Sequence, residues 1–306
     1  MKKFIIWISV IVITVVFVDL SLGYLFQHYL NSHTLPGDYE SIEKVLRHND
    51  TDILVLGSSV ALNSINTKTL EDSLRSRAFG GGGNGQTFPF FLTILKGAIA
   101  SHTPKIVVLC MPPSALTGEG VGERYNFLAP YYGEGIADID QNMNSLKKYN
   151  EFFMKSSLYK LNTIWFRIFL YFFIAPDIRG ENGHIAKPEP PSYPIKQSGK
   201  IESFSDERRV QFNEFINICK ENNIQIIVLF PPLFTDFDNL EDPDNIIGQT
   251  SKLASELGFK MYNDIALEPF AHSPELFYDN SHINFKGTEI YTDTIINRLK
   301  PYIHER

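Results

Sequence analysis

Apolar residues along this chain fall into two patterns, short continuous runs and longer segments in which they recur every three or four positions. Continuous runs rich in branched residues predict strands that are buried on both faces, as in a parallel sheet. Helical segments between the runs predict an α/β fold with a doubly wound, flavodoxin-like parallel sheet. About five strands are predicted, the second and fifth from the weakest patterns: Asp52–Leu56, Arg77–Phe79, Lys105–Met111, Ile224–Phe230 and Phe259–Tyr262.

Helices are predicted between these strands from apolar spacing and from capping residues. The segment 59–74 predicts a helix with a break near Asn66, and Thr87 is the predicted N-cap of the helix before the third strand. Asp242-Pro243 is predicted to open a helix that Gly258 closes. Three further helices are predicted: a short one around Ile42–Leu46, one from Ser205 through Asn222, and a last one at Phe285–Leu299.

The first 30 residues are the most apolar part of the chain. Two lysines precede an uncharged run up to Val18, and after Asp19 the apolar character continues to Phe26. This length suffices for a transmembrane helix, and the lysines predict a cytoplasmic N-terminus with the main domain outside the cytoplasm. Small residues at Ser21–Gly23 keep a second interpretation open, a cleaved signal peptide, which also exports the domain.

Residues 112–204 lack the alternation of strands and helices and predict an insertion after the third strand. It interrupts a predicted α/β domain of residues 51–306. A linker and short helix, residues 31–50, join this domain to the predicted anchor of residues 1–30. Within it, Leu158–Ala175 is dense in aromatic residues, but its uncharged part is too short to cross a bilayer. It is either a helix buried in or over the main domain, or a helix on the membrane surface or against a membrane partner. Pro188–Pro194 is predicted to be irregular.

Composition and charge narrow the class of protein. An apolar content of 43% and a charged content of 21% are ordinary for a globular domain. The formal net charge of -7 at pH 7 argues against nucleic-acid binding, because phosphate contacts need a basic face. Cys110 and Cys219 lie in apolar patterns without metal-ligand spacing. They are predicted to be buried hydrophobic residues rather than a disulfide pair or a nucleophile.

A glycine run, Gly80–Gly83, continues into Asn84–Thr87 and joins the second strand to a helix. Its spacing matches the dinucleotide fingerprint and nearly matches the phosphate-binding loop, but Gln86 stands where that loop needs a lysine. Three interpretations remain open: a phosphate site, a plain flexible turn, or a turn that presents the Gly85 backbone N–H to a developing oxyanion.

Three side chains with complementary chemistry follow the first and last predicted strands. Ser59 comes after the first, and Asp279 and His282 come after the last, at strand ends where open α/β sheets bind ligands. A serine becomes a nucleophile when a neighbouring base takes its proton, and a carboxylate orients that base. The pattern predicts a triad of Ser59, His282 and Asp279. Taken alone, Ser59 has the alternative of a helix cap, and His282 that of a solvated histidine at a helix start.

These segments resemble the SGNH, or GDSL-type, superfamily of esterases and acyltransferases. Gly57–Ser59 is similar to the first block of that family, with Ser59 at the nucleophile position and Ser58 in place of the usual aspartate. Asn84–Thr87 is similar to the second block, whose glycine donates a backbone N–H to the oxyanion. Asp279–His282 is similar to the fifth block, which carries the acid and the base.

The third block departs from the family pattern. The family has Gly-x-Asn-Asp after the third strand, and its asparagine gives the oxyanion a second hydrogen bond, but this chain has Met111–Ser114 there. The oxyanion donors that the resemblance implies are the N–H groups of Ser59 and Gly85. Either another side chain supplies the second bond or the oxyanion hole is weaker, and one lost donor raises the barrier by roughly 2.7–4 kcal/mol. Three residues are candidates for that role: Asn84, Asn63 and Ser114.

The resemblance covers Asp52–Ser114 and Ile224 to the C-terminus, and it extends to a membrane-anchored branch of the family. That branch is involved in O-acetylation of exopolysaccharides such as alginate or in D-alanylation of teichoic acid, beside a membrane-bound O-acyltransferase. It implies an extracytoplasmic serine esterase or O-acyltransferase, O-acetyl transfer being favoured. The substrate would be an acylated glycan or acyl donor of the cell envelope, with no metal or cofactor. A second hypothesis is a catalytically degenerate adaptor subunit that docks to such an acyltransferase.

Overall fold

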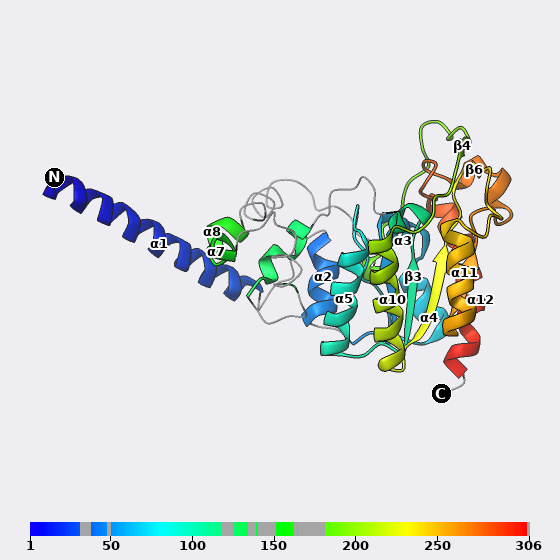
Figure 1. The fold of residues 1–306 in the computed structure, drawn as a ribbon, viewed down its shortest axis with the longest axis horizontal. Coiled ribbons are helices and arrows are strands. Elements are labelled where there is room, and N and C mark those ends of the chain that lie inside the picture. Colours follow the sequence, from blue (N-terminus) through cyan, green and yellow to red (C-terminus); the bar gives the residue numbers. More distant parts are fainter. Residues whose placement is uncertain are drawn as a thin grey trace. The chain divides into compact units, whose positions relative to one another are not determined.

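The computed structural model describes residues 1–30, 38–47, 50–117, 125–133, 139, 151–161, 164 and 181–304 (Figure 1). The chain divides into two compact units. The first unit contains Met1–Glu43 and Tyr125–Asp177, and the second contains Lys44–Arg124 and Ile178–Arg306. All predicted site residues belong to the second unit.

The first unit contains one long helix, α1 (Lys2–Leu30), drawn in blue in Figure 1. Within the described part of the chain, α1 is the one helix that is long and apolar enough to cross a membrane, and its apolar window has no buried residues. The predicted aromatic helix at Leu158–Ala175 lies mostly outside the described residues. Three short helices complete the described part of this unit: η2 (Tyr125–Tyr131), α7 (Glu151–Met154) and α8 (Ser157–Lys160). A further helix, α2 (Asp38–Arg47), spans the boundary of the two units.

The second unit contains a five-stranded sheet in the order β2-β1-β3-β5-β7, and every neighbouring pair is parallel. The predicted doubly wound α/β fold is therefore confirmed. Gly57 pairs with Cys110, and Cys110 pairs with Leu229, so the carboxyl ends of three central strands lie at one edge of the sheet. The strand bounds are β1 (Ile53–Gly57), β2 (Ala78–Gly80), β3 (Ile106–Cys110), β5 (Gln225–Phe230) and β7 (Lys260–Asn263).

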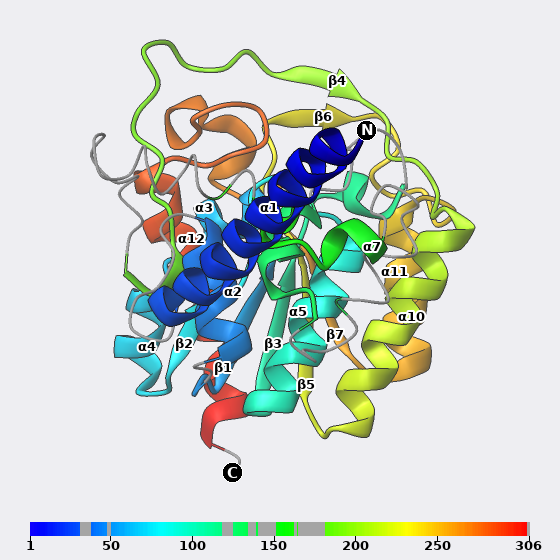
Figure 2. The same cartoon turned by 90° about the vertical axis from the view of Figure 1, so that its left-hand side faces the viewer.

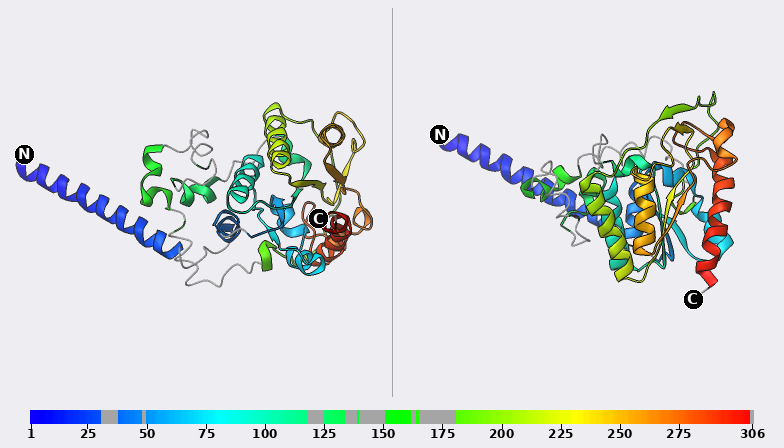
Figure 3. Two further views of the ribbon diagram at one scale, coloured as in Figure 1. Left: turned by 90° about the horizontal axis from the view of Figure 1, so that it is seen from below. Right: turned by 45° about the vertical axis from the view of Figure 1, so that its right-hand side comes forward.

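Helices cover both faces of the sheet, as Figures 2 and 3 show. On one face, alternate strand residues such as Val55 and Val108 pack with Leu70 and Tyr291 in one apolar cluster. On the other face, the Phe88 ring lies 5.8 Å from that of Phe212, which links two helices. The first face carries α3 (Ser59–Ser64), α4 (Thr67–Leu74) and α12 (Phe285–His304). The second carries α5 (Phe88–Ser101), α10 (Asp206–Glu221) and α11 (Ile246–Leu257).

The helix boundaries agree with the sequence analysis except at two caps and in the last helix, α12, which continues beyond the predicted Leu299 to His304. The predicted break near Asn66 is confirmed, because the Asn66 side chain accepts a hydrogen bond from Thr69 N (3.1 Å) and caps α4. Thr87 precedes α5 as predicted, but its hydroxyl makes no capping hydrogen bond. The predicted start of a helix at Asp242-Pro243 is wrong, since α11 begins at Ile246. There the Asn245 side chain accepts from Gly248 N (2.9 Å) and caps the helix, whereas the Asp242 carboxylate accepts from Asp244 N before the helix begins.

A second sheet was not predicted from the sequence. β4 (Gln197–Gly199) and β6 (Thr235–Phe237) form a two-stranded parallel pair. Residues 184–196 before β4 form neither helix nor strand, as expected for Pro188–Pro194. The remaining short helices of this unit are η1 (Pro113–Leu116), η3 (Glu181–Gly183), η4 (Phe270–His272) and η5 (Pro274–Leu276).

Both cysteines are free and buried, which confirms the prediction made for them. Burial raises the pKa of the Cys110 thiol above its usual range and raises that of Cys219 to about 12. Both thiols therefore stay protonated near neutral pH, and neither supplies a thiolate nucleophile.

Candidate active site

Ser59 lies at the end of β1, where the chain turns from strand into helix. Gly57 closes the strand with a φ of +153°, and a Cβ at this position would lie 1.9 Å from the Cys110 carbonyl oxygen. Only glycine therefore lets β1 approach β3 here. Ser58 follows as the N-cap of α3, and its hydroxyl accepts a long hydrogen bond from Val60 N (3.4 Å). Ser59 is consequently the first helical residue, at the edge of the sheet.

Asp279 and His282 lie on one tight turn immediately before α12. The Asp279 carboxylate accepts hydrogen bonds from the backbone N–H groups of Ser281 (2.8 Å) and His282 (2.9 Å). Such bonds from an aspartate to the backbone that follows it stabilise a turn. Asn284 then caps α12 by accepting from the N–H groups of Lys286 and Gly287. The Asp-x-x-His spacing is thus built into a turn that its own carboxylate holds.

Two threonines of α12 connect this turn to the segment that carries Ser59. The Thr288 hydroxyl donates to the Asn63 carbonyl (2.6 Å), and Asn66 N donates to the Thr292 hydroxyl (2.9 Å). The first bond reaches the last turn of α3, and the second reaches the N-cap residue of α4. They therefore join two parts of the chain that lie more than 220 positions apart.

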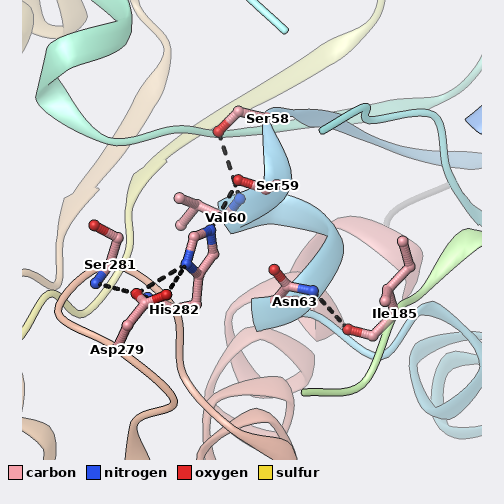
Figure 4. A network of polar contacts seen from close by, with 8 residues as sticks. All are labelled: Ser58, Ser59, Val60, Asn63, Ile185, Asp279, Ser281 and His282. Carbon is pink, nitrogen blue, oxygen red and sulfur yellow. Dashed lines mark hydrogen bonds and ion pairs between the residues drawn. The ribbon is translucent and has the colours of Figure 1, made fainter. Parts of the chain in front are cut away.

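The structure brings the three predicted side chains into one hydrogen-bonded series (Figure 4). Ser59 Oγ lies 2.8 Å from His282 Nε2, and His282 Nδ1 lies 2.9 Å from each carboxylate oxygen of Asp279. A carboxylate beside Nδ1 favours the tautomer that carries its proton there. Nε2 is then free to accept the hydroxyl proton of Ser59. This geometry has the nucleophile, base and acid in the order that acyl transfer requires.

The Asp279 carboxyl is held in its charged form. Partial burial raises its pKa, but the hydrogen bond with His282, the Ser281 N–H and the attraction of the imidazole outweigh burial. The pKa of Asp279 therefore lies below its ordinary value. A carboxylate is present at neutral pH, as stabilisation of a histidine cation requires.

The glycine run is a backbone ladder beside β1. Gly83 N donates to the Gly57 carbonyl (3.1 Å), and a Cβ on Gly82 would lie 2.8 Å from that same oxygen. Gln86 N then donates to the Gly83 carbonyl (3.2 Å) and closes a turn in which Gly85 has a φ of +64°. These close approaches explain why glycines are needed here, so a bound phosphate is not required to account for them. They bring the turn alongside the end of β1, and the role of Gly85 as an oxyanion donor stays a prediction.

The three candidates for a second oxyanion donor have different surroundings. Asn63 is fully buried, and its amide nitrogen donates to the Ile185 carbonyl (2.7 Å), as Figure 4 shows. Asn84 lies in the glycine turn and is half-buried. Ser114 follows β3 and lines the cavity that also contains Ser59. Of the three, Ser114 is thus the one that shares a cavity with the proposed nucleophile.

A cavity of about 530 Å³ opens beside Ser59 and His282. This volume is within the range of small-molecule sites. Its wall combines charged, polar, aromatic and aliphatic groups from several loops. The charged and polar residues include Lys200, Glu202, Thr235 and Asn280, and the apolar ones include Pro112, Leu233 and Phe237. In the described part of the chain, no cluster of three His, Cys, Asp or Glu side chains is placed to hold a metal ion.

Asn280, inside the triad turn, was not assigned a role from the sequence. Its side-chain amide nitrogen donates to the backbone carbonyls of Ile195 (2.8 Å) and Phe234 (2.8 Å). The backbone carbonyl of Asn280 in turn accepts from Phe234 N (2.9 Å). Asn280 therefore ties the turn to the irregular segment before β4 and to the loop between β5 and β6. Its position between Asp279 and His282 was the only sequence signal for this function.

The irregular segment before β4 is attached to the triad region at further points. Phe285 N donates to the Lys187 carbonyl (2.8 Å), and the Lys187 ammonium lies 5.3 Å from the centre of the Tyr278 ring. Lys196 donates to the Ala271 carbonyl (2.8 Å). This segment, predicted as part of the insertion at residues 112–204, supports the loops that form the site.

No protein-family model matches this chain, and no curated protein matches it. Solved structures similar to it include the psychrotrophic esterase EstA from Pseudoalteromonas inhibited by monoethylphosphonate, with 11% identity over 84% of this chain and 100% of that one (TM-score 0.44). A GDSL-like lipase from Bacteroides thetaiotaomicron has 13% identity over 91% and 97% of the two chains (TM-score 0.40). LAE5, an α/β hydrolase from the metagenome of Lake Arreo, Spain, has 12% identity over 84% and 97% (TM-score 0.43).

Proposed function

We propose that this chain is a serine esterase or O-acyltransferase of the SGNH type that works outside the cytoplasm from a membrane anchor. Its proposed substrate is an acylated polysaccharide of the cell envelope. The observation that carries the proposal is the hydrogen-bonded series of Ser59, His282 and Asp279 at the wall of a cavity. The alternative of a helix cap at Ser59 is wrong, because Ser58 is the N-cap of α3, and the Ser59 hydroxyl instead lies 2.8 Å from the imidazole of His282.

In the proposed reaction, Ser59 Oγ attacks the carbonyl carbon of the ester while His282 Nε2 accepts its proton. Asp279 keeps the imidazole in position and stabilises its positive charge. The backbone N–H groups of Ser59 and Gly85 receive the negative charge of the carbonyl oxygen. His282 then protonates the departing alcohol, which leaves the acyl group on Ser59. Water or a sugar hydroxyl, deprotonated by the same imidazole, takes the acyl group and restores the serine.

The cavity wall supports a polar substrate with a short acyl group. Lys200 and Glu202 are exposed at the cavity, and Thr235 and Asn280 contribute hydrogen-bonding groups. Phe237 adds one aromatic ring. Hydroxyl-rich sugars need such hydrogen-bonding groups and commonly lie against an aromatic ring, whereas a long acyl chain needs a continuous apolar channel. The proposal therefore favours an acylated glycan over a lipid ester.

Contacts within the first unit support a retained anchor over a cleaved signal peptide. The helix α1 continues without a break through Ser21–Gly23, the alternative cleavage segment. Asp19 Oδ1 accepts hydrogen bonds from Ser156 Oγ (2.9 Å) and from Leu158 N (2.7 Å). Cleavage after Gly23 would remove Asp19 and leave these donors without their acceptor. The lysines at the N-terminus support the proposed orientation, with the second unit outside the cytoplasm.

A fluorophosphonate probe tests the catalytic proposal, because it phosphonylates activated serines. The full-length protein in detergent is labelled and digested, and the modified peptide is identified by mass spectrometry. We expect the label on Ser59, its loss in Ser59→Ala, and a labelling rate lower by about 10²–10⁴ in His282→Ala. A label on Ser58 would show that the wrong hydroxyl was assigned.

A second function, a catalytically degenerate adaptor for a membrane-bound O-acyltransferase, is favoured by one observation. Pro112-Pro113 follows β3 where the resembling family has its second oxyanion donor, and proline has no N–H to offer in exchange. If the wild-type protein melts cooperatively, and is therefore folded, but Ser59 is not labelled, the adaptor is supported.

Where labelling occurs, incubation with an O-acetylated polysaccharide distinguishes an esterase from an acyltransferase. Free acetate indicates hydrolysis, and acetyl groups on an added acceptor glycan indicate transfer.

A further inference from the structure

Two short helices of the first unit, α7 and α8, lie beside α1 (Figure 1). The acceptor that joins them to α1 is Asp19, which bonds to Ser156 Oγ and to Leu158 N at the start of α8. Ser156 Oγ also accepts from Tyr159 N (3.3 Å) as the N-cap of α8. A Cβ on Gly23 would lie 2.3 Å from Ser157 Oγ, so the backbone of α1 directly contacts this helix. The level of α7 and α8 along α1 is thus fixed between Asp19 and Gly23.

The outward side of these helices carries large apolar side chains. Phe152 is 76% exposed, Phe153 is 50% exposed, and Leu158 is 38% exposed. The Phe153 ring lies 5.7 Å from that of Phe152 and 5.5 Å from that of Tyr159, so the rings form one cluster. Single exposed apolar residues are common on protein surfaces, but a contiguous apolar cluster generally marks a binding surface.

The position of this cluster along α1 coincides with the outer boundary of a bilayer. A helix rises about 1.5 Å per residue, so Lys3 to Asp19 measures about 24 Å and Lys3 to Gly23 about 30 Å. The hydrocarbon core of a typical bilayer is about 30 Å thick. If Lys3 marks the cytoplasmic boundary, α7 and α8 lie where the acyl chains meet the headgroups.

We propose that Glu151–Lys160 forms an interfacial foot, which inserts Phe152, Phe153 and Leu158 into the outer headgroup–acyl boundary of the membrane that α1 crosses. This inference rests on the proposed membrane anchor. Phe and Leu on the apolar face of an interfacial helix are buried at this boundary, which removes their apolar area from water. Lys155, whose side chain is 70% exposed and pairs with Glu151 (3.5 Å), is long enough to extend toward lipid phosphates from the same segment.

The foot also accounts for a carboxylate within the apolar helix. Two hydrogen bonds from the foot satisfy Asp19 at a level where water is scarce. Without them, the charge of Asp19 would favour a shallower position of α1. The foot therefore sets the depth of the anchor in addition to holding the first unit against the lipid.

Site-directed fluorescence tests the foot in the full-length protein. Cys110 and Cys219 are fully buried, so a single introduced cysteine takes up an environment-sensitive maleimide dye selectively. Phe152→Cys reports on the foot, Val12→Cys is the membrane reference, and Glu256→Cys on α11 is the aqueous reference. The labelled proteins are reconstituted into vesicles of phosphatidylethanolamine and phosphatidylglycerol. Quenching is then measured with iodide in the water and with lipids that carry a nitroxide at a shallow or a deep position.

We expect iodide quenching at position 152 to be several-fold weaker than at position 256. Shallow nitroxides should quench position 152 more than deep ones, with the reverse order at position 12. Iodide quenching at 152 equal to that at 256, while position 12 is protected, would overturn the foot and leave the anchor intact. Exposure of position 12 to iodide would overturn the anchor and the foot together. Leu158→Cys provides a second reading if the Phe152 variant does not fold.

Discussion

Asn280 offers a direct test of how the triad turn is held in place. Its two side-chain hydrogen bonds to the carbonyls of Ile195 and Phe234 are each 2.8 Å long. Asn280→Asp preserves the size of the side chain but replaces the Nδ2 amide group, which donates both bonds, with one carboxylate oxygen. This oxygen would face both carbonyls and repel them. The backbone bond from Phe234 N remains, so the change acts on the side chain alone.

The expected magnitude follows from the number and exposure of these bonds. Each neutral hydrogen bond contributes about 0.5–1.5 kcal/mol, and water can replace the one at the exposed Ile195 carbonyl. The free energy of unfolding should therefore fall by only about 1–2 kcal/mol. The reaction is more sensitive, because a displacement of about 1 Å in a catalytic group reduces the rate by about 10². We expect Ser59 labelling to slow by about 10–100-fold in Asn280→Asp and by less in Asn280→Ala.

The assay is the second-order rate of fluorophosphonate labelling at Ser59, measured beside a thermal melt. Asn239→Ala is the matched control, because Asn239 also makes two side-chain bonds to a loop backbone. It donates to the Ile201 carbonyl (2.7 Å) and accepts from Ile201 N (2.8 Å); Ile201 also lines the cavity, but neither bond involves Asp279–His282. We expect the control to lose similar stability and to label at the wild-type rate.

Two results would refute this reasoning. One is wild-type labelling in Asn280→Asp, with a loss of stability like that of the control. The other is equally slow labelling in Asn239→Ala, which would mean that general loosening of the loops explains the effect. Either result would show that the side chain of Asn280 does not position the base.

Three further predictions follow from the same contacts. Asp279→Asn should lower the labelling rate by about 10³–10⁴ at every pH from 5 to 9, because the wild-type carboxyl, with its lowered pKa, does not titrate in that range. A labelling rate restored at one end of the range would contradict the role of Asp279 in orienting His282. Gly57→Ala places a Cβ 1.9 Å from the Cys110 carbonyl oxygen. It should lower the free energy of unfolding by at least about 3 kcal/mol or prevent folding. An unchanged denaturation midpoint would contradict this crowding. Burial raises the pKa of Asp52, but hydrogen bonds from Arg77 and Lys105 outweigh burial and lower it overall. Asp52→Asn should therefore melt slightly below wild type above pH 4, with the difference shrinking as the pH falls below the ordinary aspartate pKa; a difference that does not shrink there would refute this linkage.

The central strands of the sheet follow directly from local sequence patterns. Runs such as those of β1, β3 and β5 are apolar at nearly every position, which suits strands covered on both faces. Glycine at position 57 marks the end of β1, and the capping asparagine at position 66 marks the start of α4. Such signals depend on neighbours within a few positions, so they can be read without knowledge of the tertiary structure. The cap at Asn245 shows their limit, since several polar residues there offer competing starts for one helix.

The candidate site combines both kinds of information. Ser59, Asp279 and His282 were identified from residue type and from their places after the first and last strands. Their meeting depends on Thr288 and Thr292 of α12, whose bonds to the break after α3 have no counterpart in any local pattern.

Sequence alone therefore determined the residue types of the proposed reaction, the strands that carry them and the apolar segment at the N-terminus. Only the tertiary structure decided that Asn280 and the irregular segment before β4 support the triad turn, and that Asp19 accepts bonds from α8. The physical reason is that single hydrogen bonds between loops distant in sequence leave no periodic pattern. They arise where the packed sheet and helices bring a donor and an acceptor within reach.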